Sequence, residues 1–225
     1  MIKINNILVT ITGASGAGKS TIIKELVKRN PEKYLQIPTY TTRTLRLGEK
    51  QGEQHYFIQK EEYQKLKQKK KMLACSTVEN EFYGVPKIDL RNPIYKNKII
   101  IIDIGAKGVR QLKKTYKNII SIYIMPPTPE RIKQNRNQNR LQRSIEQIKY
   151  AREVCNWLVI NDNLEKSTNE IEKVLQIIYK SGESVEKIPH KDIEFLYKKS
   201  MKNPKNKSFL ENFYQREKHS EEISI

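Results

Sequence analysis

Short apolar runs rich in isoleucine recur along the chain, separated by stretches in which apolar positions are spaced by three or four. Four of these runs predict strands, over residues 7–12, 98–104, 119–125 and 157–160. Three of the four are almost continuous in apolar residues, whereas a strand with one solvated face alternates apolar and polar positions. We therefore expect these strands to form a parallel sheet that is buried on both faces.

Helices are predicted between and after these runs. Their ranges are 19–29, 106–116, 129–137, 143–154 and 164–179. The last range carries an apolar stripe at helical spacing, which indicates a face directed at a core. The stripe consists of Ile171, Val174, Leu175, Ile178 and Tyr179. The alternation of strand and helix predicts a three-layer α/β fold, with helices on both faces of the sheet.

Residues 38–97 depart from this rhythm. Short extended pieces at 55–58 and 73–78, together with one charged helix and with Pro86 and Pro93, indicate an inserted α+β subdomain. Residues 181–225 change character again, because they hold nine Lys and Arg against eight Asp and Glu and few apolar residues. We expect a C-terminal extension that either docks on another surface or is loosely ordered.

The composition indicates one polar globular domain. The chain has 225 residues, of which 37 % are hydrophobic and 30 % charged, enough to bury a core of its own. Its two cysteines, Cys75 and Cys155, are too few for a disulfide framework, so we expect a cytoplasmic location. The N-terminal residues lack the apolar run of a signal peptide, and no run approaches the ~20 apolar residues of a membrane span. We expect no membrane partner, and the oligomeric state stays open.

The formal net charge of +18 raises the question of nucleic-acid binding. Lysine, isoleucine and asparagine are all abundant, which is also what AT-rich coding produces. Only residues 65–71 form a dense basic run, and that run follows Glu61 and Glu62 as the solvated end of a surface helix would. No aromatic residues are interleaved with the lysines for stacking on bases. A polyanion patch is the alternative, but we expect nucleic acid not to be a partner.

The strongest chemical signal directly follows the first predicted strand. Residues 13–20 read GASGAGKS and match the phosphate-loop pattern G-x-x-x-x-G-K-[ST] at every fixed position. Glycines let backbone N–H groups converge on a polyphosphate, and the next helix directs its partial positive charge at it. We expect Lys19 to reach the β- and γ-phosphates of ATP and the Ser20 hydroxyl to ligate Mg²⁺. The predicted nucleotide-binding residues are Gly13, Ala14, Ser15, Gly16, Ala17, Gly18, Lys19, Ser20 and Thr21.

A second set of residues suggests a phosphorylated acceptor. Arg43 and Arg46 lie three apart in an extended or turning segment, where two guanidinium groups can hold one anion from both sides. The Tyr83 hydroxyl is a candidate donor to the same phosphate. Taken alone, however, the two arginines are read more readily as surface residues beside a turn at Gly48.

Together these features resemble the guanylate kinase family. The resemblance covers residues 5–180 and rests on GASGAGKST at 13–21, TTRTLRLGE at 41–49, Gly52, Tyr83-Gly84, Asp103, Gly108, Pro126-Pro127 and Asn161-Asp162. It implies a P-loop core over residues 1–180, a monophosphate-binding insertion at 38–97 and a lid at 128–143. The implied reaction is phosphoryl transfer from ATP to the small-molecule acceptor GMP with Mg²⁺, giving ADP and GDP.

The resemblance also implies roles for individual residues. Asp103, at a strand end, is similar to the acidic residue that faces the acceptor and the metal-bound waters. Arg136 and Arg140 in the lid are similar to arginines that close on the transferring phosphoryl group and add catalytic charge to that of Lys19. The implied acceptor-binding residues are Thr39, Arg43, Arg46, His55, Tyr83 and Asp103.

Departures from the family pattern gather at the residues that recognise guanine. Ala74 and Gly105 stand at the positions of two guanine-binding carboxylates, and Thr39 stands at a serine position. His55 stands where the family has a phosphate-binding tyrosine. Each lost carboxylate contact costs about 1–3 kcal/mol of guanine binding. The donor half of the pattern is therefore intact, whereas the base pocket is altered.

Several functions are compatible with this pattern. If GMP is the acceptor, Glu79 or Glu81 is the nearest carboxylate that could replace the missing ones. A related kinase acting on ribose 1,5-bisphosphate would need no guanine contact. A non-catalytic interaction module of this fold would be expected to lose the phosphate loop, which is complete here. A nucleic-acid-binding ATPase, suggested by the charge, would bind with a steep dependence on salt.

Overall fold

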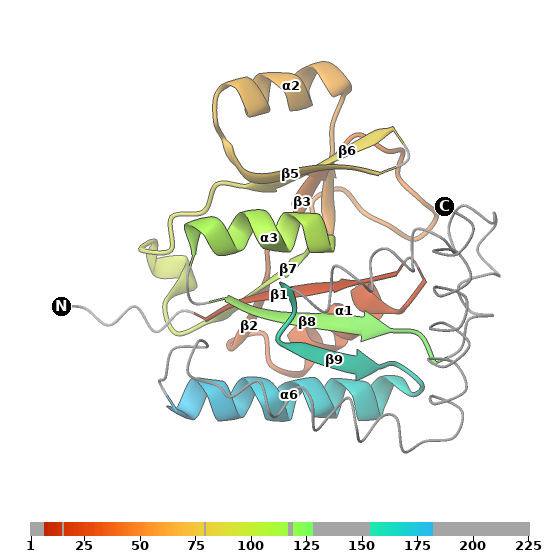
Figure 1. Ribbon diagram of the computed structural model, residues 1–225, viewed down its shortest axis with the longest axis vertical. Helices are drawn as coiled ribbons and strands as arrows, with labels where there is room; N and C mark the ends of the chain where they lie inside the picture. The colour runs from red at the N-terminus through yellow and green to blue at the C-terminus, as the bar shows by residue number, and fades with distance from the viewer. Residues whose placement is uncertain (1–6, 15, 79, 117–118, 128–153, 182–225) are drawn as a thin grey trace, which may run out of the picture.

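The computed structural model of the protein describes residues 7–14, 16–78, 80–116, 119–127 and 154–181. At its centre lies a five-stranded sheet in the order β2-β7-β1-β8-β9, in which every neighbouring pair is parallel (Figure 1). Its strands are β1 (Ile7–Gly13), β2 (Tyr34–Gln36), β7 (Ile99–Asp103), β8 (Ile119–Met125) and β9 (Trp157–Ile160). Because all five run the same way, their carboxyl ends meet at one edge of the sheet.

Helices cover both faces of this sheet, which explains its almost continuous apolar sequence. Helices α1 (Lys19–Arg29) and α6 (Leu164–Ser181) pack on one face, and α3 (Ala106–Thr115) packs on the other (Figure 1). Side chains of β7 alternate between the two cores: Ile101 packs on the α1 and α6 side, and Ile102 on the α3 side. Both are fully buried. Burying one such side chain is worth about 1.5–3 kcal/mol.

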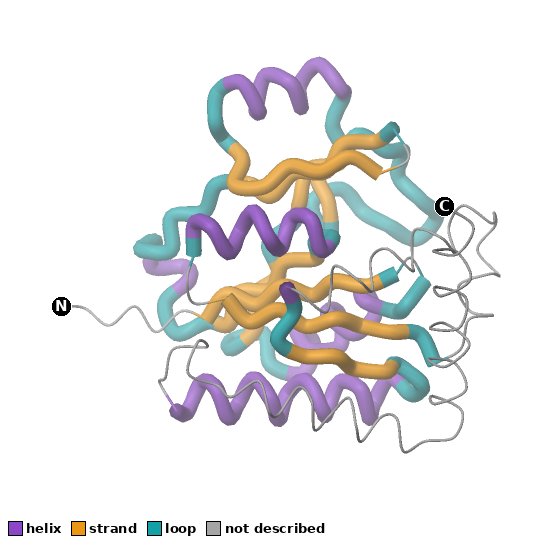
Figure 2. The backbone as a smooth tube through the Cα atoms, in the orientation of Figure 1, coloured by secondary structure: helices purple, strands orange, loops and turns teal. Residues whose placement is uncertain are grey.

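A second sheet lies beyond α3, with four strands in the order β4-β3-β6-β5 (Figure 2). Its strands are β3 (Thr39–Thr41), β4 (His55–Phe57), β5 (Met72–Val78) and β6 (Glu81–Pro86). Helix α2 (Lys60–Gln68) packs on this sheet, where the Tyr63 hydroxyl donates to the Tyr83 carbonyl at 2.9 Å. The Gln111 side chain fastens α3 to the sheet, since it accepts the Cys75 N–H and donates to the Cys75 carbonyl, both at 2.8 Å.

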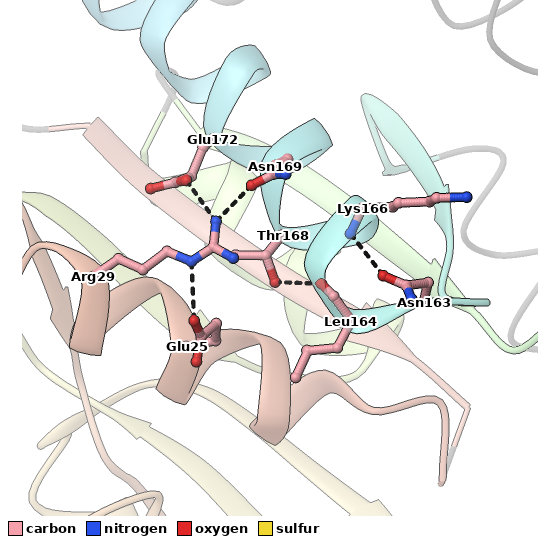
Figure 3. Close-up of polar contacts among 8 residues, drawn as sticks. All are labelled: Glu25, Arg29, Asn163, Leu164, Lys166, Thr168, Asn169 and Glu172. Atoms are coloured by element: carbon pink, nitrogen blue, oxygen red, sulfur yellow. Dashed lines mark hydrogen bonds and ion pairs between the residues drawn. The ribbon is translucent and has the colours of Figure 1, made fainter.

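Polar side chains join α1 to α6 (Figure 3). Arg29 Nη1 of α1 donates to Asn169 Oδ1 at 2.6 Å and to Glu172 Oε2 at 3.0 Å, both on α6. Asn163 caps the N-terminus of α6, because its Oδ1 accepts the backbone N–H of Lys166 at 3.0 Å. This cap sets the point where the chain leaves β9 and turns into the helix.

The main sheet and its helices agree with the sequence prediction. β8, β9 and α1 have the predicted bounds, and β1, β7, α3 and α6 differ from them by one or two residues at an end. The pattern does not predict β2, β3 or β6, nor the 3-10 turn at Pro93–Tyr95. These elements are short or interrupted by polar residues, glycine and proline, so their pairing depends on tertiary contacts.

Some predictions concern residues that the structure does not describe. The helices expected over 129–137 and 143–154 fall there, apart from Val154, and so do the lid at 128–143 and nearly all of the extension at 181–225. The boundaries of the insertion, the lid and the extension stay predictions. Within the described ranges, no helix combines the length and the apolar character that crossing a membrane requires.

Candidate active site

The carboxyl ends of the parallel strands gather the chemically important segments at one edge of the main sheet. β1 ends in Gly13, β7 ends in Asp103, and Asn161 follows β9. Ile11 of β1 pairs with Asp103, so this carboxylate lies beside the strand that leads into the glycine-rich loop. The same edge therefore holds the predicted donor residues and one predicted acceptor residue.

Residues 13–20, here called the phosphate loop, join β1 to α1. The backbone is left-handed at Gly16 and Gly18, with φ of +81° and +86°, a conformation that residues with a Cβ atom rarely adopt. Helix α1 starts directly after Gly18, whose carbonyl accepts the first intrahelical hydrogen bond at 3.0 Å. Ser20 and Thr21 are exposed in the first turn, where free N–H groups make a helix N-terminus attractive to anions.

The Lys19 side chain lies along the phosphate loop. Its Nζ donates to the carbonyls of Gly13 at 3.0 Å and Ala14 at 3.1 Å. These bonds keep the ammonium group at the loop, where a bound polyphosphate would need positive charge. The described residues of the predicted nucleotide site thus lie together, and Ser15 is outside the described residues.

Asn161 supports the phosphate loop from the neighbouring strand end, a role that the sequence analysis missed. Its Nδ2 donates to the Ala17 carbonyl at 2.8 Å, and both groups are buried. A Cβ atom on Gly18 would collide with the same amide nitrogen, so the glycine is needed for packing as well as for its φ angle. The available signal was an asparagine directly after a buried strand, at the edge where the phosphate loop also lies.

Residues 42–49, here called the acceptor turn, contain the two arginines predicted to bind the acceptor. Arg43 Nη1 and Nη2 donate to Glu49 Oε2 and Oε1 at 2.7 and 2.6 Å, which is a bidentate ion pair. Arg43 Nη1 also donates to the Thr44 carbonyl at 3.0 Å, and its guanidinium carbon lies 5.2 Å from the centre of the Phe57 ring. Arg46 lies in the same turn with an exposed side chain. One arginine is therefore held by protein groups, and the other faces solvent.

Strands of the second sheet add further predicted acceptor residues beside this turn. His55 Nδ1 on β4 lies 2.7 Å from Thr39 Oγ1 on β3. The rings of His55 and Tyr83 lie edge to face, with centroids 6.1 Å apart. The structure thus brings Thr39, His55 and Tyr83 together with Arg43, close enough to Asp103 for its charge to act on His55.

Burial and nearby charges shift the pKa values of several groups in this cluster. Burial lowers the pKa of His55, and the nearby Asp103 carboxylate only partly opposes this, so the imidazole is neutral at pH 7. The hydrogen bond from Arg43 is the main reason that the pKa of Glu49 falls to about 2. Burial disfavours the charge on Arg43, but its bonds and charge interaction with Glu49 outweigh burial and raise the pKa of Arg43. The Arg43–Glu49 pair therefore stays ionised at any physiological pH.

The two positions where the family's guanine-binding carboxylates are missing, Ala74 and Gly105, lie close to α3. Ala74 on β5 is buried in the apolar core beside α3. Gly105 precedes α3, and a Cβ atom added there would meet nothing within 4 Å. The Glu81 carboxylate accepts the Thr42 hydroxyl at 2.5 Å, which directs it to the acceptor turn. Glu79, the other candidate carboxylate, lies outside the described residues, as do Arg136 and Arg140.

These features define a class of protein. A glycine-rich phosphate loop links the central strand of a parallel sheet to a helix. An arginine-bearing turn connects two strands of a second sheet, where His55 lies close enough to the Asp103 carboxylate for its charge to act on the ring. This is the arrangement of P-loop kinases, which bring two phosphorylated molecules together for transfer of a phosphoryl group.

The chain belongs to the guanylate kinase family. A sequence model described as Guanylate kinase matches residues 5–177. The guanylate kinase of Carboxydothermus hydrogenoformans is 35 % identical over 178 residues, which cover 75 % of this chain and 86 % of that protein. The guanylate kinase of Rickettsia prowazekii is 32 % identical over 183 residues, which cover 77 % and 92 %.

A solved structure is similar in fold. The crystal structure of guanylate kinase from Anaplasma phagocytophilum matches with a TM-score of 0.66 and 23 % sequence identity, covering 83 % of this chain and 92 % of that one. This likeness bears on the fold alone. The sequence-based predictions of a P-loop α/β fold and of the family are both confirmed.

Proposed function

We propose that this protein transfers the γ-phosphoryl group of ATP to GMP, giving ADP and GDP. The observation that supports this proposal is the position of Asp103 between the phosphate loop and the cluster around the acceptor turn, the two elements that we propose bind phosphate. Asp103 ends the strand beside the loop, and its charge acts on His55 of the acceptor side. Phosphoryl transfer requires in-line placement of two polyanions more than covalent chemistry. The position of Asp103 near both elements supports such a placement of the two phosphate groups.

On the donor side, the backbone N–H groups of the phosphate loop bind the polyphosphate. Lys19, held at the loop by two carbonyls, adds positive charge where negative charge develops during transfer. Asn161 keeps the loop in shape through the Ala17 carbonyl. Arg136 and Arg140 of the lid add further charge in this proposal.

We also propose that Mg²⁺ assists the reaction. Among the described residues, no cluster of three or more His, Cys, Asp or Glu could hold a metal ion by itself. A single hydroxyl from Ser20 and one nearby carboxylate from Asp103 fit Mg²⁺, which typically keeps several of its waters and binds through substrate phosphates with few protein ligands. Ser20 at the start of α1 would hold it, with Asp103 facing its waters. When bound, the ion neutralises charge on the donor phosphates.

On the acceptor side, the phosphate of GMP binds to the cluster around the acceptor turn. Arg43, Arg46 and Tyr83 supply charge and hydroxyl donors, and His55 supplies a ring nitrogen. Arg43 Nη1 and Nη2 already donate to Glu49, so the exposed side chain of Arg46 is the one that can adjust its position to the phosphate.

A second acceptor is supported by the surroundings of the base pocket. Ala74 and Gly105 offer no hydrogen-bond acceptor on their side chains, and Ala74 is part of an apolar core. Guanine presents two donor groups that would need other partners, whereas a sugar bisphosphate presents none of them. Ribose 1,5-bisphosphate is therefore the alternative substrate to test beside GMP.

One assay separates these acceptors. ADP release from ATP and Mg²⁺ is measured with GMP, dGMP, AMP, UMP, CMP, dTMP and ribose 1,5-bisphosphate at matched concentrations. We expect the highest kcat/KM with GMP. A higher value with ribose 1,5-bisphosphate would replace the acceptor but keep the reaction class, and no turnover with any of them would overturn the proposal.

We also propose that the enzyme works in the cytosol. Both cysteines are free, as expected for a protein of a reducing compartment. Burial raises the pKa of the Cys155 thiol to about 12, so this thiol is inert at physiological pH.

A further inference from the structure

Glu49 contacts both arginines of the acceptor turn, although it has no role of its own in the proposed reaction. Its two carboxylate oxygens accept hydrogen bonds from both terminal nitrogens of Arg43, at 2.7 and 2.6 Å. Oε2 also accepts the backbone N–H of Arg46 at 2.9 Å. A third link comes from the main chain, because the Glu49 N–H donates to the Arg46 carbonyl at 3.0 Å. One residue thus ties both predicted phosphate-binding arginines together.

We propose that Glu49 is a positioning residue that presets the acceptor site for a phosphate group. By fixing the Arg43 fork and the Arg46 backbone, it gives the turn one shape before the acceptor arrives. The proposal rests on the proposed function, because it assigns the acceptor turn to the phosphate of the acceptor. Glu49 itself, as a carboxylate, repels that phosphate and acts only through the arginines.

The surroundings of the pair make this arrangement rigid. The side chain of Arg43 is 10 % exposed and that of Glu49 20 %, so the pair is less screened by water than a surface ion pair. The Phe57 ring packs against the guanidinium. Gly48, with φ of +81°, allows the tight turn that returns Glu49 to Arg43.

Charge and geometry predict opposite effects when the Glu49 charge is removed. Glu49→Gln leaves Arg43 without its counter-charge, so simple electrostatics predicts tighter binding of a phosphate dianion and a lower KM for GMP. Loss of positioning predicts the reverse, because the amide cannot accept both guanidinium nitrogens and Arg43 becomes free to move. The sign of the change in KM therefore identifies the role of Glu49.

The experiment compares steady-state kinetics of wild type, Glu49→Gln and Glu49→Asp, with GMP and ATP varied in turn. We expect Glu49→Gln to raise KM for GMP about 10-fold or more and to leave KM for ATP unchanged within about twofold. Glu49→Asp, which keeps the charge, should recover part of the loss. Glu53→Gln is the matched control, since Glu53 is a nearby glutamate with loose ion pairs to Lys24 at 3.5 Å and Lys50 at 3.7 Å.

A double mutant tests whether Glu49 acts through Arg43. In the Arg43→Ala background, adding Glu49→Gln should change KM for GMP by less than about twofold. Thermal unfolding and calorimetric binding of GMP to each variant separate misfolding from lost affinity.

Distinct outcomes overturn the inference and the proposed function. A KM for GMP that is unchanged or lower in Glu49→Gln overturns the positioning role while GMP kinase activity stands. Equal rises in KM for GMP and ATP would show a general structural effect and overturn it as well. If the wild-type protein neither binds nor phosphorylates any monophosphate, the proposed function fails and the inference falls with it.

Discussion

The phosphate loop and the acceptor turn are both expected to bind phosphate, but they are built in different ways. The loop is shaped by its own backbone, with left-handed glycines, a following helix N-terminus and one lysine held by loop carbonyls. The acceptor turn is shaped by side chains, above all by the Arg43–Glu49 ion pair against Phe57. The geometry of the loop follows from adjacent residues, whereas the acceptor turn also needs β3 and β4 to pair so that Phe57 lies against Arg43.

The contrast has a functional meaning. A loop made from backbone groups recognises any polyphosphate and tolerates little change, because a Cβ atom at Gly18 would meet Asn161. A turn made from side chains can change its ligand through single substitutions. Two of the departures from the family pattern, His55 and Ala74, lie on the second sheet, and Gly105 lies between β7 and α3. We therefore expect removal of Lys19 to lower kcat more than any substitution in the acceptor turn does, and acceptor-turn variants to change affinity or selectivity.

The largest effect is expected from the donor side. Lys19→Ala should lower kcat by about 10²–10³-fold or more, because it removes the charge next to the transferring group. The fold should remain, since Lys19 is not part of a core. Steady-state ADP release and circular dichroism measure the two properties. Lys24→Ala on the exposed face of the same helix is the control, and wild-type kcat in Lys19→Ala would show that the phosphate-loop assignment is wrong.

A smaller and more selective effect is expected at the acceptor turn. Arg43→Ala should raise KM about 10- to 100-fold for every phosphorylated acceptor, the scale of a lost charge-assisted contact of ~1.5–3 kcal/mol. KM for ATP should not change. The measurement is KM for each member of the acceptor panel. A rise in KM for acceptors with one particular base only would contradict a phosphate-binding role for Arg43 and would indicate a role in base recognition.

The support of the phosphate loop by Asn161 predicts an intermediate effect on ATP. Asn161→Asp keeps the size of the side chain but removes the donor to the Ala17 carbonyl and places two acceptors face to face. KM for ATP should rise about 5- to 30-fold, the equivalent of ~1–2 kcal/mol, while KM for GMP stays near the wild-type value. The neighbouring exposed Asp162→Asn is the control. An equal rise in KM for ATP and for GMP would mean that Asn161 supports the whole edge of the main sheet and not the phosphate loop in particular.

The smallest effect concerns stability and pH. The pKa of Glu49 is lowered from 4.5 to about 2, mainly by its hydrogen bond from Arg43. A carboxylate with a depressed folded-state pKa adds stability that is present above about pH 4.5 and is lost as the pH falls toward 2. The free energy of unfolding of wild type should exceed that of Glu49→Gln by about 1 kcal/mol at neutral pH, and this difference should shrink to zero in acid. Urea unfolding between about pH 2 and 7 measures it, and a pH-independent difference would assign the effect to packing.

Much of the core could be predicted from the sequence because its signals are local. Residues of β8 are apolar at almost every position and all buried, so the strand is visible without knowledge of its neighbours. The same holds for α1, which begins after the phosphate loop. β2 and β3 were missed because their short sequences, YLQ and TYT, mix polar and apolar residues and form no apolar run. They become strands by pairing with β7 in one case and with β4 and β6 in the other.

The sequence by itself determined the phosphate loop, because eight adjacent residues supply its turn, its lysine and its helix N-terminus. It also determined which residue types stand in the acceptor turn. Only the tertiary structure decided that Glu49 occupies the Arg43 fork, that Asn161 reaches the Ala17 carbonyl, and that His55 lies near Asp103. The physical reason is that strand order, which the local sequence does not reveal, brings Asn161 to Ala17 across 144 residues and His55 close to Asp103. Glu49 and Arg43 are six residues apart, and the path of the turn decides that their side chains meet.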